Sequence, residues 1–283
     1  MQTSKALNIS RRQVLSGLVS AILPASIFAQ TVQLSRTVYE VEATTGFQGS
    51  YVFVPQKASP SGVILMLHGS EGGANGSYIW LAHWLASYGF ITMPLPYSVG
   101  GNTWHAGDII RVSIDRTEQA LDTLRKHSAS NGKAGICGYS RGAEHALLVA
   151  SLLARDKPSQ VPQAVAVHAA SDVAVRDFYS AGVYPNEPKP RSAPLPSWTW
   201  RGTEIPVGKE IEIERFAGGV FLSHGELDDI WTVQKTRNLE KRLRDAGRSP
   251  ITRYFADQKH GLSATKRTEL MREWVQFFST HLS

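Results

Sequence analysis

The chain has 283 residues, of which 42% are hydrophobic, so it can bury one large core, and α/β folds of this length are commonly a single domain. Its single cysteine, Cys137, excludes an internal disulfide bond. The net charge of +6 is poor evidence for nucleic-acid binding, because a basic amino-terminal segment contributes much of it.

Residues 1–29 are predicted to be an export signal of twin-arginine type. Arg11 and Arg12 precede an apolar run, residues 14–28, of about signal-peptide length, and no acidic residue occurs before Glu40. The run is too short and too interrupted for a good membrane span, although an uncleaved membrane anchor is the alternative interpretation. We expect an exported protein, periplasmic or secreted.

Cleavage after Ala29 changes the charge of the chain. It removes three of the 30 basic residues and no acidic residue, which leaves 27 basic against 24 acidic residues, a net charge of +3. Residues 30–283 are then expected to form one α/β domain with a mostly parallel sheet flanked by helices.

The first predicted strands precede a glycine-rich loop. Loose alternation over residues 32–54 predicts the edge strands of a hairpin. The continuous apolar run 63–67 is typical of a strand buried on both faces of a parallel sheet. Residues 68–73 follow it, and glycine there lets backbone amides approach a ligand closely. We expect the amide of Ser70 to form half of an oxyanion hole, with an ordinary strand-to-helix turn as the alternative.

Two helices and a strand are predicted next. A helical stripe covers residues 78–88, an apolar strand covers residues 90–95, and a second helix covers residues 108–127. The loop over residues 98–107 carries Trp104, which we expect to line a pocket, although packing is the alternative role for such an aromatic residue.

Residues 134–143 contain the motif Gly-x-Ser-x-Gly, with Ser140 at its centre. A short apolar run precedes the motif and an alanine-rich run follows it, which predicts the strand, sharp turn and helix of a nucleophile elbow. Side chains at positions 138 and 142 would collide with the strand or the helix, which explains the glycines. We predict that Ser140 is a nucleophile and that the amide of Arg141 completes the oxyanion hole. Cys137 is interpreted as a small buried core residue.

The second half of the chain alternates strands and helices with one interruption. A buried strand is predicted over residues 164–168, and the alternation indicates a parallel, right-handed α/β sheet. Six prolines within residues 181–208 forbid a regular helix or central strand there. We interpret this segment as an insertion that walls the substrate pocket, with a linker as the alternative. Its tryptophans, Trp198 and Trp200, favour an apolar or aromatic substrate group.

The acid and the base of a catalytic triad are predicted from two loops. A strand over residues 219–224 runs into Gly-x-x-Asp, which places Asp228 where the acid belongs in the order Ser, Asp, His; Asp229 is the alternative. After a last strand, His260 lies beside a glycine that permits its imidazole to reach Ser140 and Asp228. His145 and His224 fall within helix or strand patterns and have no predicted role.

Three elements complete the prediction: a helix over residues 233–246, a strand over 251–255 and a final helix over 268–281. We expect five residues to line the substrate pocket: Glu71, Trp104, Tyr139, Trp198 and Trp231. No His, Cys and Glu cluster has ligand spacing, so neither a metal nor a cofactor is expected. The expected partner is a small-molecule ester or thioester.

Four segments in sequential order, residues 69–73, 138–144, 225–231 and 259–261, resemble those of the α/β-hydrolase superfamily. More narrowly, they are similar to the carboxyl-terminal domain of acyl-CoA thioester hydrolases and bile-acid-CoA:amino-acid N-acyltransferases, with dienelactone-hydrolase-like proteins next. The resemblance extends from about residue 38 to the end and implies the α/β-hydrolase fold with a Ser-His-Asp triad. In that family the acyltransferases use cysteine and the hydrolases mostly serine, so Ser140 implies hydrolysis.

An exported serine hydrolase that cleaves a carboxylic ester is therefore the predicted function. Coenzyme A thioesters are not expected outside the cytoplasm, which favours the oxygen ester. The alternatives are a thioester hydrolase, a peptidase of the same fold, and a catalytically silent binding protein that keeps the fold.

Overall fold

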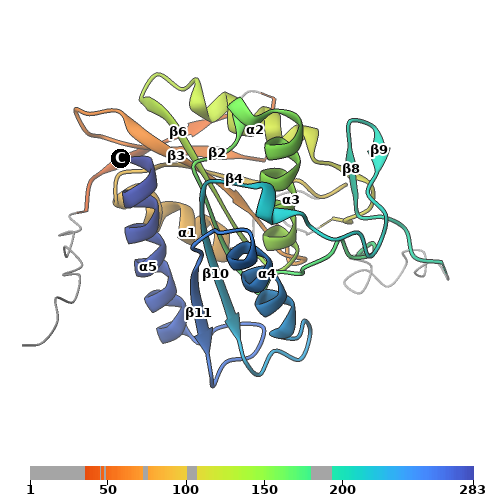
Figure 1. Cartoon of the computed structure of the whole chain (residues 1–283). Coiled ribbons are helices and arrows are strands. Elements are labelled where there is room, and N and C mark those ends of the chain that lie inside the picture. Colours follow the sequence, from red (N-terminus) through yellow and green to blue (C-terminus); the bar gives the residue numbers. More distant parts are fainter. Residues whose placement is uncertain (1–35, 45, 48, 73–75, 101–106, 180–192) are drawn as a thin grey trace, which may run out of the picture. The chain divides into compact units, whose positions relative to one another are not determined.

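Eight strands form the central sheet of the computed structural model, in the spatial order β1-β2-β4-β3-β6-β7-β10-β11 (Figure 1). β1 (Tyr39–Ala43) and β2 (Tyr51–Pro55) pair antiparallel as the predicted hairpin, and β2 is antiparallel to β4. The other six strands are parallel, which confirms the predicted sheet. They are β3 (Ser61–Leu67), β4 (Ile91–Leu95), β6 (Ser130–Tyr139), β7 (Ala164–His168), β10 (Gly219–Gly225) and β11 (Ile251–Phe255).

The structure describes residues 36–283 except 45, 48, 73–75, 101–106 and 180–192. Three predictions therefore lie outside the described residues: the export signal, the pocket residue Trp104, and the proline-rich first part of the insertion. In the part that is described, no helix has the length and apolar character needed to cross a membrane.

A helical layer covers each face of the sheet. Successive side chains of a strand point to opposite faces, so a strand that is apolar at every position presents apolar side chains to both layers. Val63, Leu65 and Leu67 of β3 pack in one core cluster, whereas Ile64 and Met66 pack in the other. A fully buried side chain of this size contributes about 1.5–3 kcal/mol, so an unbroken apolar run stabilises both layers. The first layer holds α2 (Asp115–Arg125), α3 (Arg141–Asp156) and α4 (Gln234–Asp245), and the second holds α1 (Gly76–Ser87) and α5 (Ala264–Leu282) (Figure 1).

The helix predicted over residues 108–127 was predicted too long at its amino-terminal end. α2 begins at Asp115, because the residues before it pair with distant segments of the chain. Ile109 bridges to Phe178, and β5 (Val112–Ser113) pairs in parallel with β8 (Trp198–Trp200). These bonds satisfy the backbone groups that a helix would otherwise use, and the helical pattern cannot reveal such distant partners.

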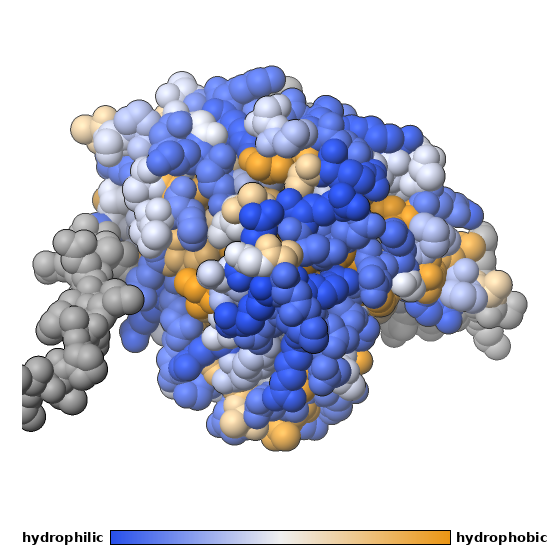
Figure 2. Space-filling view, viewed as in Figure 1, coloured by the Kyte–Doolittle hydropathy of each residue, from blue (hydrophilic) through white to orange (hydrophobic). Residues whose placement is uncertain are grey.

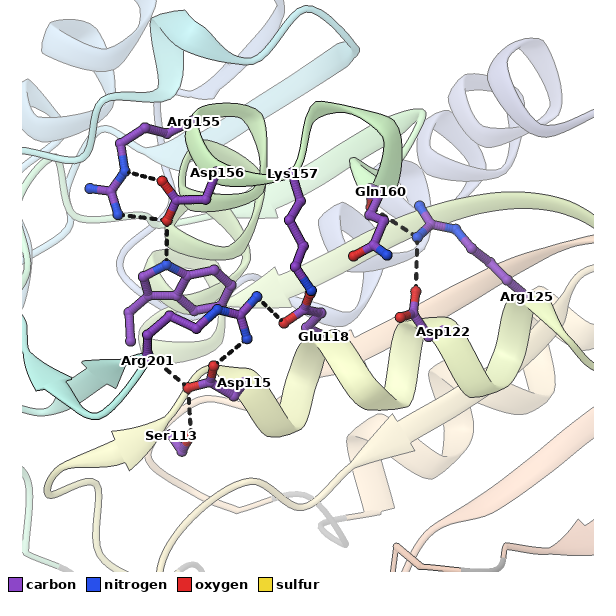
Figure 3. Close-up of polar contacts among 11 residues, drawn as sticks. Ser113, Asp115, Glu118, Asp122, Arg125, Arg155, Asp156, Lys157, Gln160 and Arg201 are labelled. Atoms are coloured by element: carbon purple, nitrogen blue, oxygen red, sulfur yellow. Dashed lines mark hydrogen bonds and ion pairs between the residues drawn. The ribbon is translucent and has the colours of Figure 1, made fainter.

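The described part of the insertion, residues 193–208, contains a small hairpin instead of a helix or a central strand, as its prolines predict. β8 pairs with β9 (Thr203–Glu204), and the hairpin is fastened to the layer of α2 and α3. Arg201 forms ion pairs with Asp115 and Glu118 of α2 (Figure 3). Trp200 Nε1 donates to Asp156 Oδ2 at the end of α3, over 2.6 Å.

Candidate active site

Ser140 lies on the sharp turn between β6 and α3, in the strand–turn–helix arrangement predicted from its motif. Its backbone torsions are φ 52° and ψ −118°, in a region that costs about 1–3 kcal/mol for a residue with a side chain. A Cβ atom at Gly138 would lie 2.2 Å from the carbonyl oxygen of Gly142, and one at Gly142 would lie 2.0 Å from the carbonyl oxygen of Leu67. Both glycines are therefore sterically required, as predicted.

A hydrogen-bond chain joins Ser140, His260 and Asp228. His260, in the loop between β11 and α5, has Nε2 2.9 Å from Ser140 Oγ and Nδ1 2.7 Å from Asp228 Oδ2. Asp228 follows β10, and its alternative, Asp229, points instead to Lys259 with an ion pair of 3.0 Å. The fold thus brings together three side chains that are up to 120 positions apart in the sequence.

The carboxylate of Asp228 accepts four hydrogen bonds. The backbone amides of Ile230 and Trp231 donate to Oδ1 over 2.8 and 2.9 Å, and His260 and His224 contact Oδ2. Burial by itself raises the pKa of Asp228, but the bonds from the two histidines and the two amides outweigh burial and lower that pKa well below the ordinary value. The carboxylate is therefore ionised throughout the neutral range.

Two buried histidines of this network had no predicted role. His224, at the end of β10, lies 2.8 Å from Asp228 Oδ2. His168, at the end of β7, has Nε2 3.3 Å from the backbone oxygen of His260. Adjacent parallel strands end at the same edge of the sheet, so both residues lie beneath the loops that carry Asp228 and His260. The sequence offers one signal for His224, its position four residues before Asp228.

The residues predicted for an oxyanion hole lie on neighbouring loops. β3 pairs with β6 up to Leu67 and Gly138, so the loop with Ser70 leaves the sheet beside the turn that carries Ser140. Arg141 is the first residue of α3, and amides of the first helical turn have no carbonyl partner within the helix. The two predicted donors therefore lie on loops that leave adjacent strands of the sheet.

A cavity of 320 Å³ opens at Ser140 and His260. Ser70, Glu71 and Tyr139 also line this cavity, so the structure brings two of the five predicted pocket residues to it. Trp231 lies beside His260, with the two rings edge-to-face and their centroids 5.9 Å apart.

Trp198 does not line this cavity, and the prediction that it does was wrong. The side chain is 0% exposed, and its Nε1 donates to Glu144 Oε1 over 2.6 Å. Glu144 is itself fully buried in α3, and a buried carboxylate needs hydrogen-bond donors such as Trp198 Nε1. This bond holds the described part of the insertion, residues 193–208, against the layer of α3. Helices α1 and α5 supply the cavity wall instead, through side chains such as Leu81, Met271 and Trp274.

Besides Ser140 and His260, the cavity wall carries the charged side chains of Glu71 and Arg267 among mainly apolar and aromatic residues. The hydroxyl of Tyr78 accepts from the Gly69 amide over 2.8 Å and bonds to the Glu71 carboxylate; burial first, and then that carboxylate, raise its pKa well above the ordinary value. Arg267 lies over the ring of Trp80 at 5.9 Å. Within the described residues, no three His, Cys, Asp or Glu side chains are arranged to hold a metal ion.

Exposed apolar side chains surround the turn after β10. Leu227 and Ile230 are 56% and 66% exposed, and Ile230 also lines the cavity. Figure 2 shows an otherwise mostly hydrophilic face with an apolar patch at its lower end, over the loops that follow β10 and β11. Trp80, at 42% exposed, adds a further apolar side chain to the cavity.

We expect acid to destabilise the protein through its buried histidines. Burial is the main cause that lowers the pKa of His68 to about 4 and those of His145 and His168 to about 3. Unfolded imidazoles take up protons below about pH 6.5, whereas these three stay neutral. The unfolded state thus binds more protons, and stability falls from about pH 6.5 to pH 4, by up to about 1.4 kcal/mol per pH unit for each histidine.

Urea unfolding at several pH values measures this loss. His145→Phe removes one of the three groups. Its Nδ1 has no partner among the described residues, and the variant loses the one bond between Nε2 and Thr117 Oγ1, a loss of stability that does not depend on pH. The variant is expected to show a shallower fall of stability with pH. An unchanged slope would contradict the assignment of the acid sensitivity to these side chains.

Comparisons with known proteins agree with this architecture. The model of the family described as the dienelactone hydrolase family matches residues 47–276. This is the second of the two narrower resemblances, and the first, to acyl-CoA thioester hydrolases, is not confirmed. No curated protein matches.

Several solved structures share the fold. A protein of Klebsiella pneumoniae described as a dienelactone hydrolase is 14% identical, with a TM-score of 0.58, over 81% of this chain and 92% of that one. An esterase of Thermogutta terrifontis is 16% identical, with a TM-score of 0.58, over 88% and 93%. Dipeptidyl peptidase 4 of Porphyromonas gingivalis is 15% identical, with a TM-score of 0.61, over 87% of this chain but 36% of that longer one. The protein therefore has the predicted α/β-hydrolase fold.

Proposed function

The chain belongs to the dienelactone hydrolase family, and we propose that it is an exported serine hydrolase that cleaves a carboxylic ester through an acyl-enzyme. The observation that carries the proposal is the unbroken hydrogen-bond chain from Ser140 Oγ through His260 to Asp228, with lengths of 2.9 and 2.7 Å. This series of hydrogen bonds has the order serine, histidine, aspartate and the contacts that activation of a serine requires.

In the proposed mechanism, Ser140 Oγ attacks the acyl carbonyl carbon as His260 Nε2 takes the hydroxyl proton. Asp228 keeps the other proton on Nδ1 of His260 and stabilises the imidazolium that forms. The amides of Ser70 and Arg141 donate to the oxyanion, each contributing about 3–4 kcal/mol. His260 then gives its proton to the leaving alkoxide, and water, deprotonated by the same imidazole, cleaves the acyl-enzyme and restores the serine.

The cavity supports an ester with an apolar or aromatic group. Its 320 Å³ lies at the lower end of the range for small-molecule sites, and its wall is mainly aliphatic and aromatic. The exposed side chains of Trp80 and Ile230 extend this apolar character outward. Cavity size and lining therefore favour a small ester over a polymeric substrate.

The export part of the proposal rests on the sequence alone. Arg11, Arg12 and the apolar run after them support a twin-arginine signal and an extracytoplasmic site of action. Export favours an oxygen ester over a coenzyme A thioester. Recovery of the unprocessed chain in the cytoplasmic fraction of its native cell would argue against this part.

A matched substrate panel tests the function. One acyl group is presented to the full chain as an oxygen ester, a thioester and an anilide, and a fluorophosphonate probe measures serine reactivity. We expect the largest kcat/KM for the oxygen ester and labelling at Ser140. A clear preference for the thioester would make the protein a thioesterase, and a clear preference for the anilide would make it a peptidase. Folded protein that neither turns over substrate nor takes the label would be a binding protein.

A further inference from the structure

We propose that His224 is a positioning residue for Asp228, and that its Nε2–H is a second donor to the carboxylate oxygen that holds His260. This inference rests on the proposed triad and adds to it a second histidine that does not touch Ser140. His224 is fully buried at the end of β10, and each of its polar contacts lies within the same turn or on α4.

The partners of the ring determine its tautomer. Nε2 of His224 lies 2.8 Å from Asp228 Oδ2 and 2.9 Å from the backbone oxygen of Trp231, and an ionised carboxylate and a carbonyl can only accept. Nε2 must therefore carry a proton. Nδ1 lies 2.7 Å from Thr236 Oγ1, a hydroxyl that can donate to it. The neutral Nε2–H form satisfies both ring nitrogens.

This donor completes the set around Asp228. Oδ1 is held by the amides of Ile230 and Trp231, and Oδ2 by the rings of His224 and His260. Without the His224 donor, Oδ2 has one partner, and the carboxylate has more freedom to rotate about its side-chain torsion. The orientation of the His260 ring then varies, and a small misplacement in an active site can lower the rate about 100-fold.

The charged and titratable groups near His224 are not expected to change the pH profile in the way that loss of the His224 donor would. The ring of His168 lies 6.3 Å from that of His224, and burial lowers its pKa to about 3, so it stays neutral at the pH of an assay. Asp229 and Lys259 pair with each other at 3.0 Å. Glu226, the other acid of the turn, pairs with Arg237 of α4 at 2.8 Å.

Two substitutions whose side chains are equal in length distinguish the effect of hydrogen bonding from the effect of packing. His224→Gln keeps an N–H donor near the position of Nε2, whereas His224→Met fills similar space without a donor. His145→Phe is the matched control: His145 is also fully buried and also contacts a threonine hydroxyl, Thr117 Oγ1 at 3.0 Å, but it lies on α3. All three variants are compared with the wild type by kcat, KM, thermal midpoint and the pH profile of kcat/KM.

His224→Met is expected to lower kcat by about 10- to 100-fold with KM changed less than about twofold. The acid limb of its profile is expected to move to higher pH, because Oδ2 keeps negative charge that the N–H had offset. His224→Gln is expected to recover most of kcat and the wild-type limb, and His145→Phe to keep the limb. The proposal would be overturned if His224→Met kept the wild-type kcat and the wild-type acid limb of the pH profile. It would also be overturned if kcat fell in all three variants only in proportion to their thermal midpoints.

Nitrogen-15 NMR of the histidines in the wild-type chain gives a test that needs no variant. His224 is expected to show a protonated Nε2 and a bare Nδ1, and the opposite tautomer would overturn the proposal even if His224→Met does not fold. A wild-type protein without ester turnover or fluorophosphonate labelling would refute the proposed function. The two failures are therefore distinct.

Discussion

Ser140→Ala is expected to lower kcat for the preferred ester by about 10⁵- to 10⁶-fold, because no other group at the turn can form the acyl-enzyme. The fold should be retained, since the Ser140 hydroxyl contacts His260 Nε2 and the substitution removes one atom from a partly exposed site. Burst-phase and steady-state kinetics measure the loss, and the thermal midpoint verifies folding.

Ser151→Ala provides the control for this substitution. Ser151 is a buried serine of the same helix, α3, and its hydroxyl donates to the carbonyl oxygen of Leu148 over 3.0 Å. We expect this variant to lose a little stability and to keep its activity. A Ser140→Ala protein that retains more than about a hundredth of the wild-type kcat would refute the nucleophile.

Glu144→Ala is expected to produce the largest loss of stability, about 3–5 kcal/mol. Glu144 is fully buried and accepts from Arg141 Nη1 at 3.1 Å, from the Val175 amide at 2.8 Å and from Trp198 Nε1 at 2.6 Å. Alanine leaves a buried guanidinium without its ion-pair partner and two other donors without an acceptor. For a domain of this size the thermal midpoint should fall by about 10 °C.

Two variants identify the source of this loss. Glu144→Gln keeps an acceptor oxygen for Val175 and Trp198 but not the charge, so its loss should be smaller. Glu212→Ala removes a partly exposed carboxylate that pairs with Lys209 and Arg215, and surface pairs contribute about 0–1 kcal/mol. If the thermal midpoint of Glu144→Ala falls no further than that of Glu212→Ala, the hydrogen bonds of Glu144 with Arg141, Val175 and Trp198 do not stabilise the start of α3.

Parts of this protein follow from local pattern alone. The run over residues 63–67 is apolar at every position because both faces of β3 are covered, and that requirement is visible in a single segment. Gly138 is likewise a local necessity, since a side chain there would collide with the Gly142 carbonyl of the same turn. At Gly142 the collision would be with the Leu67 carbonyl of the adjacent strand, but the motif itself is visible in a single segment. Asp228 was predicted from the Gly-x-x-Asp that follows a strand, and His260 from its place beside a glycine after the last strand. The structure brings the two together because parallel strands end at one edge of the sheet.

Other parts depend on partners that are distant in the sequence. Whether residues 108–114 continue a helix depends on Phe178 and Trp198, which offer backbone pairing that no helical pattern reveals. The side of the molecule that Trp198 faces depends on Glu144, 54 positions away.

The sequence by itself therefore determined the parallel sheet, the elbow and the loops that carry Ser140, Asp228 and His260, because periodicity and turn motifs are local properties. Only the tertiary structure decided which helices wall the cavity and which buried histidine contacts Asp228. A hydrogen-bond partner or a cavity wall is chosen by the packing of remote segments, and no single segment carries that information.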